Sequence, residues 1–435
     1  MWMITTTEQQ KINPEELEGI NLDLLRRCVN YDTSKFVHSS VNLIRYEFSP
    51  AESRDGFYSF FRIGAEWLDV EQTKSIVVIP KVKNIDFIEI FMNCLRDNEE
   101  WDNFEAVYDI DFNARPVRSK ALCSILSPLL VVQFLLVVKK ITNRGLRKGY
   151  VSRKENLMKV KGRLNIRRTE RNAMLGHREQ MNCTYDEFSA DTPENRFIKK
   201  ALYVAHDMIS LMHGHKSYDM ISAMCNHCMS AFSEVSDDEN RQPPAPKSNN
   251  LYHEYSDALR FAKMILRYQD LAINRYNYMD MDVVPVFRID MALLFEHYAL
   301  SLLRRTFGKS SIMYQVKGYG GRFIADFLIA KGCLKAIIDT KYVDSESNNV
   351  AIPQYVKQLS AYARDKVLLK ALGIHTSDEE SIPVVPCVIL YPALTTSELT
   401  AGSILSYPVK QTLKFYTYPI QIPTYRLPEF GLSGN

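Results

Sequence analysis

The sequence GRFIADFLIAKGCLKAIIDTK, residues 321–341, contains two apolar runs that meet at Gly332-Cys333. A glycine after a strand-like run predicts a β-hairpin. With Gly332-Cys333 as a two-residue turn, Asp326 lies directly opposite Asp339, and a longer symmetric loop would give the same pairing. Because strand side chains alternate between the two faces of a sheet, Lys341 shares its face with Asp339.

The two opposed carboxylates indicate a metal site. Directly opposed Cβ atoms lie roughly 5 Å apart, and carboxylates at that separation repel unless a cation lies between them. Asp326, followed by Asp339-Thr340-Lys341 on the paired strand, is typical of Mg²⁺ nucleases of the PD-(D/E)xK type. We predict that Asp326, Asp339 and the Thr340 carbonyl bind Mg²⁺, while Lys341 orients the attacking water and steadies the developing negative charge. The alternative is an ordinary hairpin with charged residues on its solvent face.

A helix is predicted upstream of the hairpin, over residues 289–303, with Asp290 near its N-terminus. Glu296 is the one internal carboxylate in this largely apolar stretch. Nucleases of this type often bring a helical glutamate toward the metal, so Glu296 is a candidate further ligand, directly or through water. The alternative interpretation is a glutamate at the rim of the site.

A second helix is predicted downstream, with Pro353 in its first turn. Tyr355, Gln358 and Tyr362 follow at steps of three and four, so they share one face. The pattern Gln-x-x-x-Tyr after the Asp-x-Lys strand resembles a motif of the RecB-like nucleases. We predict that Gln358 and Tyr362 position the phosphate; the alternative is an amphipathic helix with aromatic packing.

The order of these elements predicts the fold class. Helix, strand pair and helix are followed by apolar strand candidates at residues 384–390 and 412–417, which favours a mixed α/β sheet covered by helices. We predict a PD-(D/E)xK restriction-endonuclease-like domain over residues 281–435. It would follow an N-terminal α+β region over residues 1–120 and a basic, mainly helical central region over residues 121–280.

Charge is concentrated in one part of the chain. The net charge over 435 residues is only +3, which excludes a global DNA-binding field. Residues 139–178, however, contain 14 Lys or Arg against two acids, Glu155 and Glu170. Glycines in this stretch predict loops and short strands. The basic stretch would suit a phosphate backbone or an acidic partner surface; the alternative is a solvated surface balanced by acids elsewhere.

Other signals are weaker. The eight cysteines are scattered and no signal peptide opens the chain, so a cytoplasmic protein with free thiols is expected. The apolar run over residues 121–138 is interrupted by polar residues and Pro128, which favours a buried helix over a membrane span. A zinc site at Cys225 and Cys228 would need a second ligand pair at a usual spacing, and none follows.

Two blocks of residues carry a family resemblance. The first comprises Gly149-Tyr150, Glu155-Asn156-Leu157, Lys161-Gly162-Arg163, residues 183–188, Asp191-Thr192 and Asn195-Arg196; the second comprises Asp290-Met291, Leu294-Phe295-Glu296, Asp326, residues 339–342, Gln358 and Tyr362. Together they resemble the McrC subunits of McrBC-type modification-dependent restriction systems. One departure is Ala325, where the family usually has proline. The N-terminal 120 residues match only loosely.

The resemblance implies an endonuclease subunit that works with a second protein. Its partner McrB would be an AAA+ GTPase that forms hexameric rings and recognises modified cytosine in double-stranded DNA. McrC docks on that ring, stimulates GTP hydrolysis and cuts DNA when translocation stalls. The N-terminal and central regions would dock, and the basic stretch would serve the partner, the DNA or both. The expected cofactor remains Mg²⁺, from the Asp326 and Asp339-Thr340-Lys341 pattern, and no membrane association is expected, because the apolar run over residues 121–138 is interrupted.

Two other functions stay open at this point. One is a non-catalytic adaptor that activates a motor NTPase through a degenerate nuclease fold, although the intact Asp, Asp and Lys set argues against it. The other is a stand-alone RecB-like DNA repair nuclease, which would act on free DNA ends without a GTPase partner.

Overall fold

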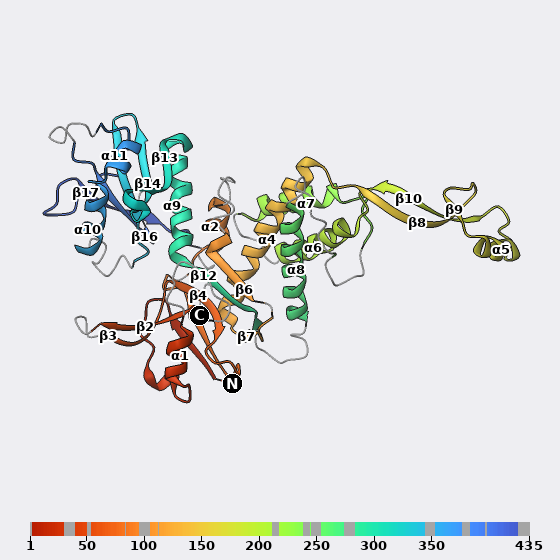
Figure 1. The fold of residues 1–435 in the computed structure, drawn as a ribbon, viewed down its shortest axis with the longest axis horizontal. Helices are drawn as coiled ribbons and strands as arrows, with labels where there is room; N and C mark the ends of the chain where they lie inside the picture. Colours follow the sequence, from red (N-terminus) through yellow and green to blue (C-terminus); the bar gives the residue numbers. More distant parts are fainter. Residues whose placement is uncertain are drawn as a thin grey trace, which may run out of the picture. The chain divides into compact units, whose positions relative to one another are not determined.

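The computed structural model describes residues 2–29, 40–49, 54–82, 84–94, 105–111, 113–210, 217–237, 244, 254–273, 283–343, 353–375, 383–395 and 398–424. These residues form several sheets and ten α-helices, which confirms a mixed α/β protein. The chain divides into two compact units (Figure 1). Unit 1 contains residues 1–124 and 281–435, and unit 2 contains residues 125–280.

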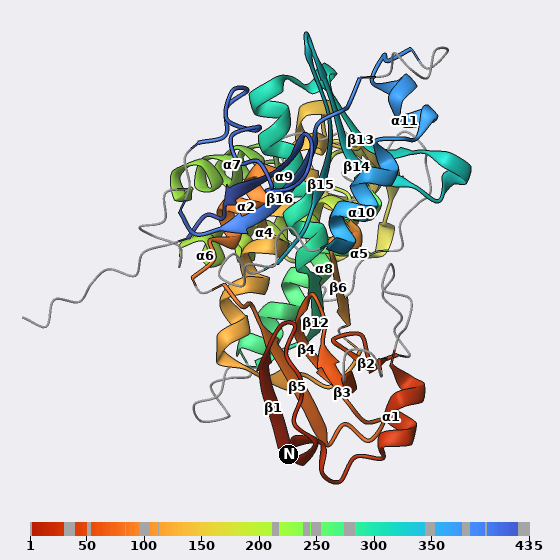
Figure 2. The same ribbon diagram turned by 90° about the vertical axis from the view of Figure 1, so that its left-hand side faces the viewer.

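The first sheet of unit 1 has five strands in the order β1-β5-β4-β12-β6 (Figure 2). They are β1 (Trp2–Thr7), β5 (Lys74–Ile79), β4 (Arg62–Trp67), β12 (Val286–Asp290) and β6 (Tyr108–Asp111). The β1–β5 pair is parallel, and the other pairs are antiparallel. Because β12 lies between β4 and β6, a strand from beyond residue 281 completes a sheet otherwise built by the N-terminal region.

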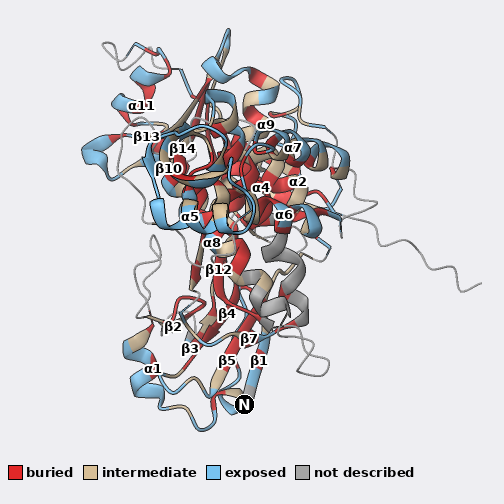
Figure 3. Cartoon of the chain, turned by 90° about the vertical axis from the view of Figure 1, so that its right-hand side faces the viewer, coloured by how far each residue is buried: buried red, intermediate tan, exposed pale blue. Residues whose placement is uncertain are grey.

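Buried charges hold β12 in this sheet. Arg288 is 4% exposed, and its guanidinium donates to Glu66 on β4 at 2.9 Å and to Asp109 on β6 at 2.6 Å. The Arg288 guanidinium therefore pairs with an acid on each neighbouring strand. These directional ion pairs favour the placement of β12 between β4 and β6. Figure 3 shows the surrounding strands β4, β5 and β12 as mostly buried.

Smaller elements of unit 1 pack beside this sheet. Helix α1 (Leu22–Cys28) and the hairpin β2 (Ile44–Ser49) with β3 (Arg54–Ser59) contribute Leu25, Ile44 and Phe57 to an apolar core shared with Ile4 and Ile76. Strands β7 (Val117–Arg118) and β11 (Val283–Val284) form a short antiparallel pair. Helix α2 (Phe87–Cys94) packs against helix α9 (Met291–Phe307).

The second sheet of unit 1 has the order β13-β14-β15-β16-β17. Its strands are β13 (Ile312–Lys317), β14 (Ile324–Lys331), β15 (Leu334–Thr340), β16 (Cys387–Ala393) and β17 (Phe415–Gln421). The first three strands are antiparallel and the last three are parallel. The two downstream strands predicted from the sequence are therefore present, each beginning three residues later than expected.

Helices cover both faces of the second sheet. They are α9 (Met291–Phe307), α10 (Pro353–Tyr362) and α11 (Lys366–Ala371). Leu328 of β14 packs with Leu368 of α11, whereas the adjacent Phe327 stacks on Tyr314, which contacts His297 of α9. Adjacent strand residues point to opposite faces, so α9 and α11 lie on opposite sides of β14.

Unit 2 consists of helices and one long hairpin. Its helices are most of α4 (Lys120–Arg144), α6 (Pro193–Ser210), α7 (Tyr218–Ala231) and α8 (Glu254–Ile273), with α6 in contact with both α7 and α8. In α4 the side chains from Leu129 to Val138 are largely buried, which confirms the predicted buried helix. Within the described residues, no helix combines the length and the hydropathy needed to cross a bilayer.

The predicted basic stretch forms most of the hairpin. Strand β8 (Gly149–Leu157) pairs along its length with β10 (Met181–Ser189), which also pairs with the short β9 (Arg163–Leu164). Helix α5 (Ile166–Met174) has no buried residue and lies at the far end of the hairpin from the helices of unit 2 (Figure 1). The loops and strands that the glycines predicted are confirmed, whereas helix α5 and the last turns of α4 within this stretch were not predicted.

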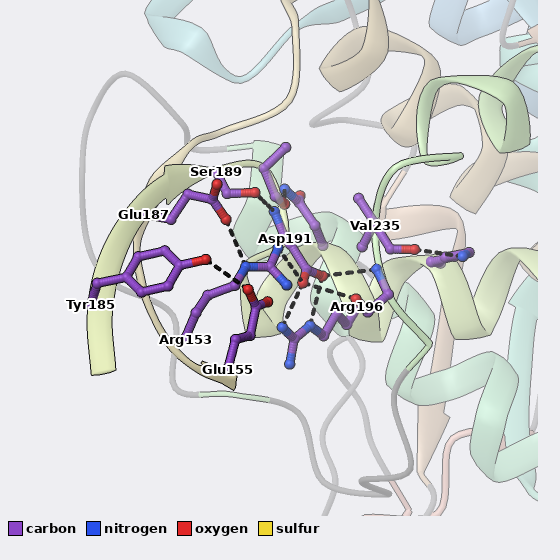
Figure 4. A network of polar contacts seen from close by, with 12 residues as sticks. Arg153, Glu155, Tyr185, Glu187, Ser189, Asp191, Arg196 and Val235 are labelled. Carbon is purple, nitrogen blue, oxygen red and sulfur yellow. Dashed lines mark hydrogen bonds and ion pairs between the residues drawn. The ribbon is translucent and has the colours of Figure 1, made fainter. Parts of the chain in front are cut away.

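An ion cluster lies at the base of this hairpin (Figure 4). Asp191 accepts two hydrogen bonds from Arg196, at 2.8 and 2.7 Å, and two from Ser236, at 2.8 and 2.9 Å. Arg153 of β8 adds a contact at 3.4 Å. Burial opposes ionisation, but these hydrogen bonds and the Arg196 charge lower the pKa of Asp191 to about 2. One carboxylate thus joins β8, α6 and the segment after α7.

Candidate active site

The β14–β15 hairpin has the predicted register. Lys331 pairs with Leu334, which makes Gly332-Cys333 the two-residue turn. Gly332 has a φ of +56°, a left-handed conformation that glycine adopts without a steric penalty. The ladder continues to Phe327 opposite Ile338, so Asp326 and Asp339 are the next residues beyond its last pair.

Asp326 closes the open end of the ladder. Its Oδ2 accepts hydrogen bonds from the backbone nitrogen and the hydroxyl of Thr340, both at 2.7 Å. A side-chain carboxylate thus satisfies a strand amide that has lost its main-chain partner. Burial raises the pKa of Asp326, and the hydrogen bonds from Thr340 together with the charge of Lys341 only partly offset this effect.

Asp339 is buried beside Lys341. Only 1% of Asp339 is exposed, and Lys341 Nζ lies 2.5 Å from its Oδ2. Apart from this ion pair, Asp339 Oδ2 has no hydrogen-bond partner among the described residues. Burial and the nearby charge of Asp326 raise the pKa of Asp339 to about 7, although the Lys341 ammonium opposes the shift.

Lys341 remains a cation in this setting. Burial alone would lower its pKa, but the charges of Asp339 and Asp326 outweigh burial and raise it. The ammonium also lies 5.0 Å from the centre of the Tyr355 ring on α10, within cation–π range. The ion pair with Asp339 shows that Lys341, one residue beyond β15, points to the same side as Asp339, as the alternation of strand side chains predicted.

Glu296 approaches the same cluster from α9. This helix begins after Asp290, whose side chain caps it by accepting from the Leu293 nitrogen at 3.1 Å. Glu296 Oε1 accepts from Gln315 Nε2 at 3.1 Å. Burial, followed by the charge of Asp326, raises the pKa of Glu296 to about 8, with a further contribution from Asp339. Three carboxyl groups are thus close enough to perturb one another.

Gln358 and Tyr362 lie on α10 but face each other. Gln358 Nε2 donates to the Tyr362 hydroxyl at 2.9 Å, and the Tyr362 ring packs against Phe323 at 5.6 Å between ring centres. Within the described residues, neither side chain forms a hydrogen bond or ion pair with Asp326, Asp339 or Lys341. The residue of this helical face that reaches the cluster is Tyr355.

Gln315 is a site residue that the sequence did not reveal. Its φ of +46° is unusual for a residue other than glycine. It lies at a break in the β13–β14 ladder, between the pairs Tyr314–Phe327 and Val316–Ala325. The irregular backbone accompanies the side-chain contact with Glu296, and no local sequence signal marks such a position.

The donor set has a clear chemical character. The possible ligands are carboxylate oxygens from the second sheet and α9, which suit a hard divalent cation better than zinc. The Lys341 ammonium lies beside them and cannot itself bind a metal. Within the described residues, no three His, Cys, Asp or Glu side chains stand in a ready metal-binding group. Cys225 and Cys228 are buried in α7, and burial raises their pKa values to about 11 and about 12, which keeps both thiols protonated.

Comparison with known proteins places the chain in a family. The family model "McrBC 5-methylcytosine restriction system component" matches residues 67–365, more than half of the chain. The chain belongs to this family. The match includes both blocks of residues that carried the resemblance in the sequence, and it confirms the predicted family.

Two solved structures are similar to this McrBC family member. One is a half-complex from a tetradecameric assembly of Thermococcus gammatolerans McrB AAA+ hexamers with bound McrC, with 14% identity over 96% of this chain and 94% of that chain and a TM-score of 0.40. The other is the Thermococcus gammatolerans McrBC complex, with 15% identity over 70% and 87% of the two chains and a TM-score of 0.31. No curated protein matches the sequence.

Proposed function

We propose that this McrBC family member is the Mg²⁺-dependent DNA endonuclease subunit of a methylcytosine-dependent restriction complex. The observation that carries the proposal is the buried cluster of Asp326, Asp339 and Lys341 at the open end of one hairpin. Family membership supplies the biological setting, and the order of α9, the hairpin and α10 is that expected of a PD-(D/E)xK domain.

The cluster suits a divalent cation. Without one, burial raises the pKa values of Asp326, Asp339 and Glu296. Repulsion from a neighbouring carboxylate adds to the shift at Asp339 and at Glu296, so the folded protein disfavours the ionised forms. Asp339 Oδ2 is a buried oxygen with unused hydrogen-bonding capacity. We assign Mg²⁺ to Asp326, Asp339 and the Thr340 carbonyl, with Glu296 as a lesser ligand. When bound, Mg²⁺ supplies Lewis-acid polarisation of the scissile phosphate.

The protein residues would divide the remaining work. Lys341 keeps its proton and is held by the Asp339 ion pair and the Tyr355 ring, so it presents a fixed positive charge that orients water and stabilises negative charge at the phosphate. Two hydrogen bonds from Thr340 hold the Asp326 carboxylate in place. Gln358 and Tyr362 stay candidates for contacting the phosphate, although they bond to each other here.

The proposed partner is an McrB-like AAA+ GTPase ring that recognises modified cytosine in double-stranded DNA. The basic hairpin of unit 2 is our candidate for docking on it. Besides its cationic residues, its tip exposes Met158 at 74%, Ile166 at 65% and Met174 at 87%. Exposed apolar side chains favour a protein surface over a phosphate backbone. Serine at these three positions is expected to weaken partner binding while leaving DNA binding by this chain unchanged.

The decisive experiment is cleavage of methylated and unmethylated plasmid in Mg²⁺, with the AAA+ partner and with or without GTP. We expect cutting only with methylation, GTP and both proteins. Asp339→Ala should abolish cutting while partner binding persists. Asp69→Ala is the matched control, because it removes a carboxylate from an exposed turn of unit 1 and should leave cutting intact.

Each other result points to a different function. Cutting by this chain alone, indifferent to GTP and methylation, would identify a stand-alone nuclease. Faster GTP hydrolysis by the partner without any cutting would identify a non-catalytic adaptor. Persistent cutting by a folded Asp339→Ala protein would refute the assigned site.

A further inference from the structure

Tyr342, the residue after Lys341, is held by two residues that follow strands of the first sheet of unit 1, Glu8 after β1 and Lys81 after β5. Its hydroxyl donates to Glu8 Oε1 at 2.8 Å. Lys81 Nζ donates to its carbonyl at 3.1 Å and lies 4.2 Å from the centre of its ring. The carbonyl, the ring and the hydroxyl of one residue are therefore all contacted, and Tyr342 is only 4% exposed.

Glu8 and Lys81 act from the same end of one strand pair. Glu8 follows β1, and Lys81 follows β5 after a single proline. The Glu8 backbone nitrogen donates to Ile79 at 3.2 Å, and Glu8 Oε1 accepts from the Lys81 backbone nitrogen at 3.0 Å. The parallel β1–β5 pair thus fixes both side chains on a rigid element before they reach Tyr342.

The burial of Glu8 is costly. Its side chain is 2% exposed, and Oε2 has no hydrogen-bond partner among the described residues. Burial raises the pKa of Glu8 to about 7, Asp290 adds to the shift, and Lys81 and the Tyr342 hydroxyl oppose it. A carboxylate buried at this cost is a candidate for a functional contact.

The contact also reaches α9. The Tyr342 ring lies 6.0 Å from Phe295, the neighbour of Glu296. On the strand side, the Lys341 nitrogen donates to Leu390 at 2.9 Å, and the Val343 nitrogen donates to the Lys341 carbonyl at 2.9 Å. Tyr342 therefore connects Lys341, its neighbour in the chain, with α9, the helix that contains Glu296.

We propose that Glu8 and Lys81 are positioning residues of the nuclease site, which fix the ammonium of Lys341 relative to Asp339 and Glu296 by clamping Tyr342. The proposal rests on the nuclease function proposed above. It implies that residues 281–435 contain all the reacting groups but do not position them correctly by themselves. Glu8 and Lys81, at the end of the β1–β5 pair, complete the site.

The test compares full-length variants in the complete, GTP-supplied cleavage reaction. Glu8→Ala and Tyr342→Phe should lower kcat roughly 10- to 100-fold, because small displacements of catalytic groups cost that much, with KM for DNA unchanged. Glu8→Gln should restore near-normal kcat, since the amide oxygen can still accept both hydrogen bonds. Ser59→Ala is the control, because it removes a buried hydroxyl that bonds to Thr7 and Gln10 in the same region without touching Tyr342.

Hydrogen exchange supplies a readout that is independent of cleavage. Glu8→Ala should speed exchange of the amides at residues 339–343, whereas Ser59→Ala should not. Unchanged exchange and unchanged kcat in Glu8→Ala would overturn the clamp. Faster local exchange in a protein whose wild type cuts no DNA would support the clamp and refute the nuclease function instead.

Discussion

Asp191 in unit 2 and Asp339 in unit 1 are both almost fully buried, yet they lie in opposite electrostatic settings. Asp191 accepts bonds from two arginines and a serine on both oxygens (Figure 4), and its pKa falls to about 2. Asp339 has one lysine and a second carboxylate nearby, and its pKa rises to about 7. Asp191, with both oxygens fully hydrogen-bonded, has a structural role. Asp339, with few partners, can still bind a cation.

The largest effect we expect is on cleavage by Lys341→Met. The change removes the fixed cation and leaves Asp339 facing Asp326 without compensation, so the single-turnover cleavage rate should fall about 10²- to 10³-fold. Single-turnover kinetics at saturating partner measure the chemical step directly. A rate within tenfold of wild type would mean that Lys341 is only the counterion of Asp339, as Arg196 is for Asp191.

Asp191→Ala should destabilise the protein more than it affects chemistry. Removing the carboxylate leaves Arg196 and Arg153 without their shared anion, and the free energy of unfolding of unit 2 should fall by about 3 kcal/mol. Chemical denaturation, with hydrogen exchange of α6 to localise the loss, measures this change. Asp186→Ala is the control, because it removes an exposed aspartate from the same strand as the hairpin base. Equal stability of the two variants would contradict a structural role for Asp191.

The two aspartates should also give opposite pH dependence of stability. Asp191 has a lowered pKa, so its contribution of about 2 kcal/mol is complete above pH 4 and is lost as the pH falls through about 2. Asp339 has a raised pKa, so without metal its protonated form stabilises the fold at low pH, and this is lost as the pH rises from about 4 to about 7. In EDTA, Asp339→Asn should therefore gain stability over wild type as the pH rises through that range.

The smallest effects concern two hydroxyl groups. Ser236→Ala removes a bond to the fully ionised Asp191 and should cost about 2 kcal/mol, because bonds to charged acceptors are the stronger ones. Thr340→Val removes the equivalent bond to Asp326, whose ionised form is disfavoured by burial, and should cost about 1 kcal/mol, the value typical of a bond to a neutral acceptor. Denaturation midpoints of both variants at pH 7 test the ranking, and the reverse order would contradict it.

Local features of the site were predictable from the sequence. Gly332-Cys333 fixed the hairpin register, and Asp290 marked the start of α9, because turns and caps depend on neighbouring residues. The strand expected at residues 384–390 begins later, at Cys387, because Pro386 has no backbone N–H to donate to a ladder.

Long-range contacts were not predictable in this way. Glu8 and Tyr342 are 334 residues apart, and β12 enters the N-terminal sheet through Arg288, a residue with no local signal for that pairing. The division at residues 120 and 280 likewise stays a prediction, drawn from changes in composition that do not report which strands pair. The same holds for Gln358 and Tyr362. Their spacing predicts that they share one face of a helix, but it does not predict which residues that face contacts.

The place of β12 in the first sheet has a consequence during biosynthesis. β6 ends at Asp111 and β12 begins at Val286, 175 residues later, counted as 286 minus 111. At translation rates of 5–20 residues per second, the nascent sheet waits roughly 10 to 35 seconds for its missing strand. During that interval the edge of β4 that will later pair with β12 has no partner strand. Such an unpaired edge can pair with the strand of another chain and lead to aggregation. Unit 2 is synthesised in that interval, so the first sheet can be completed only after the middle of the chain has emerged from the ribosome.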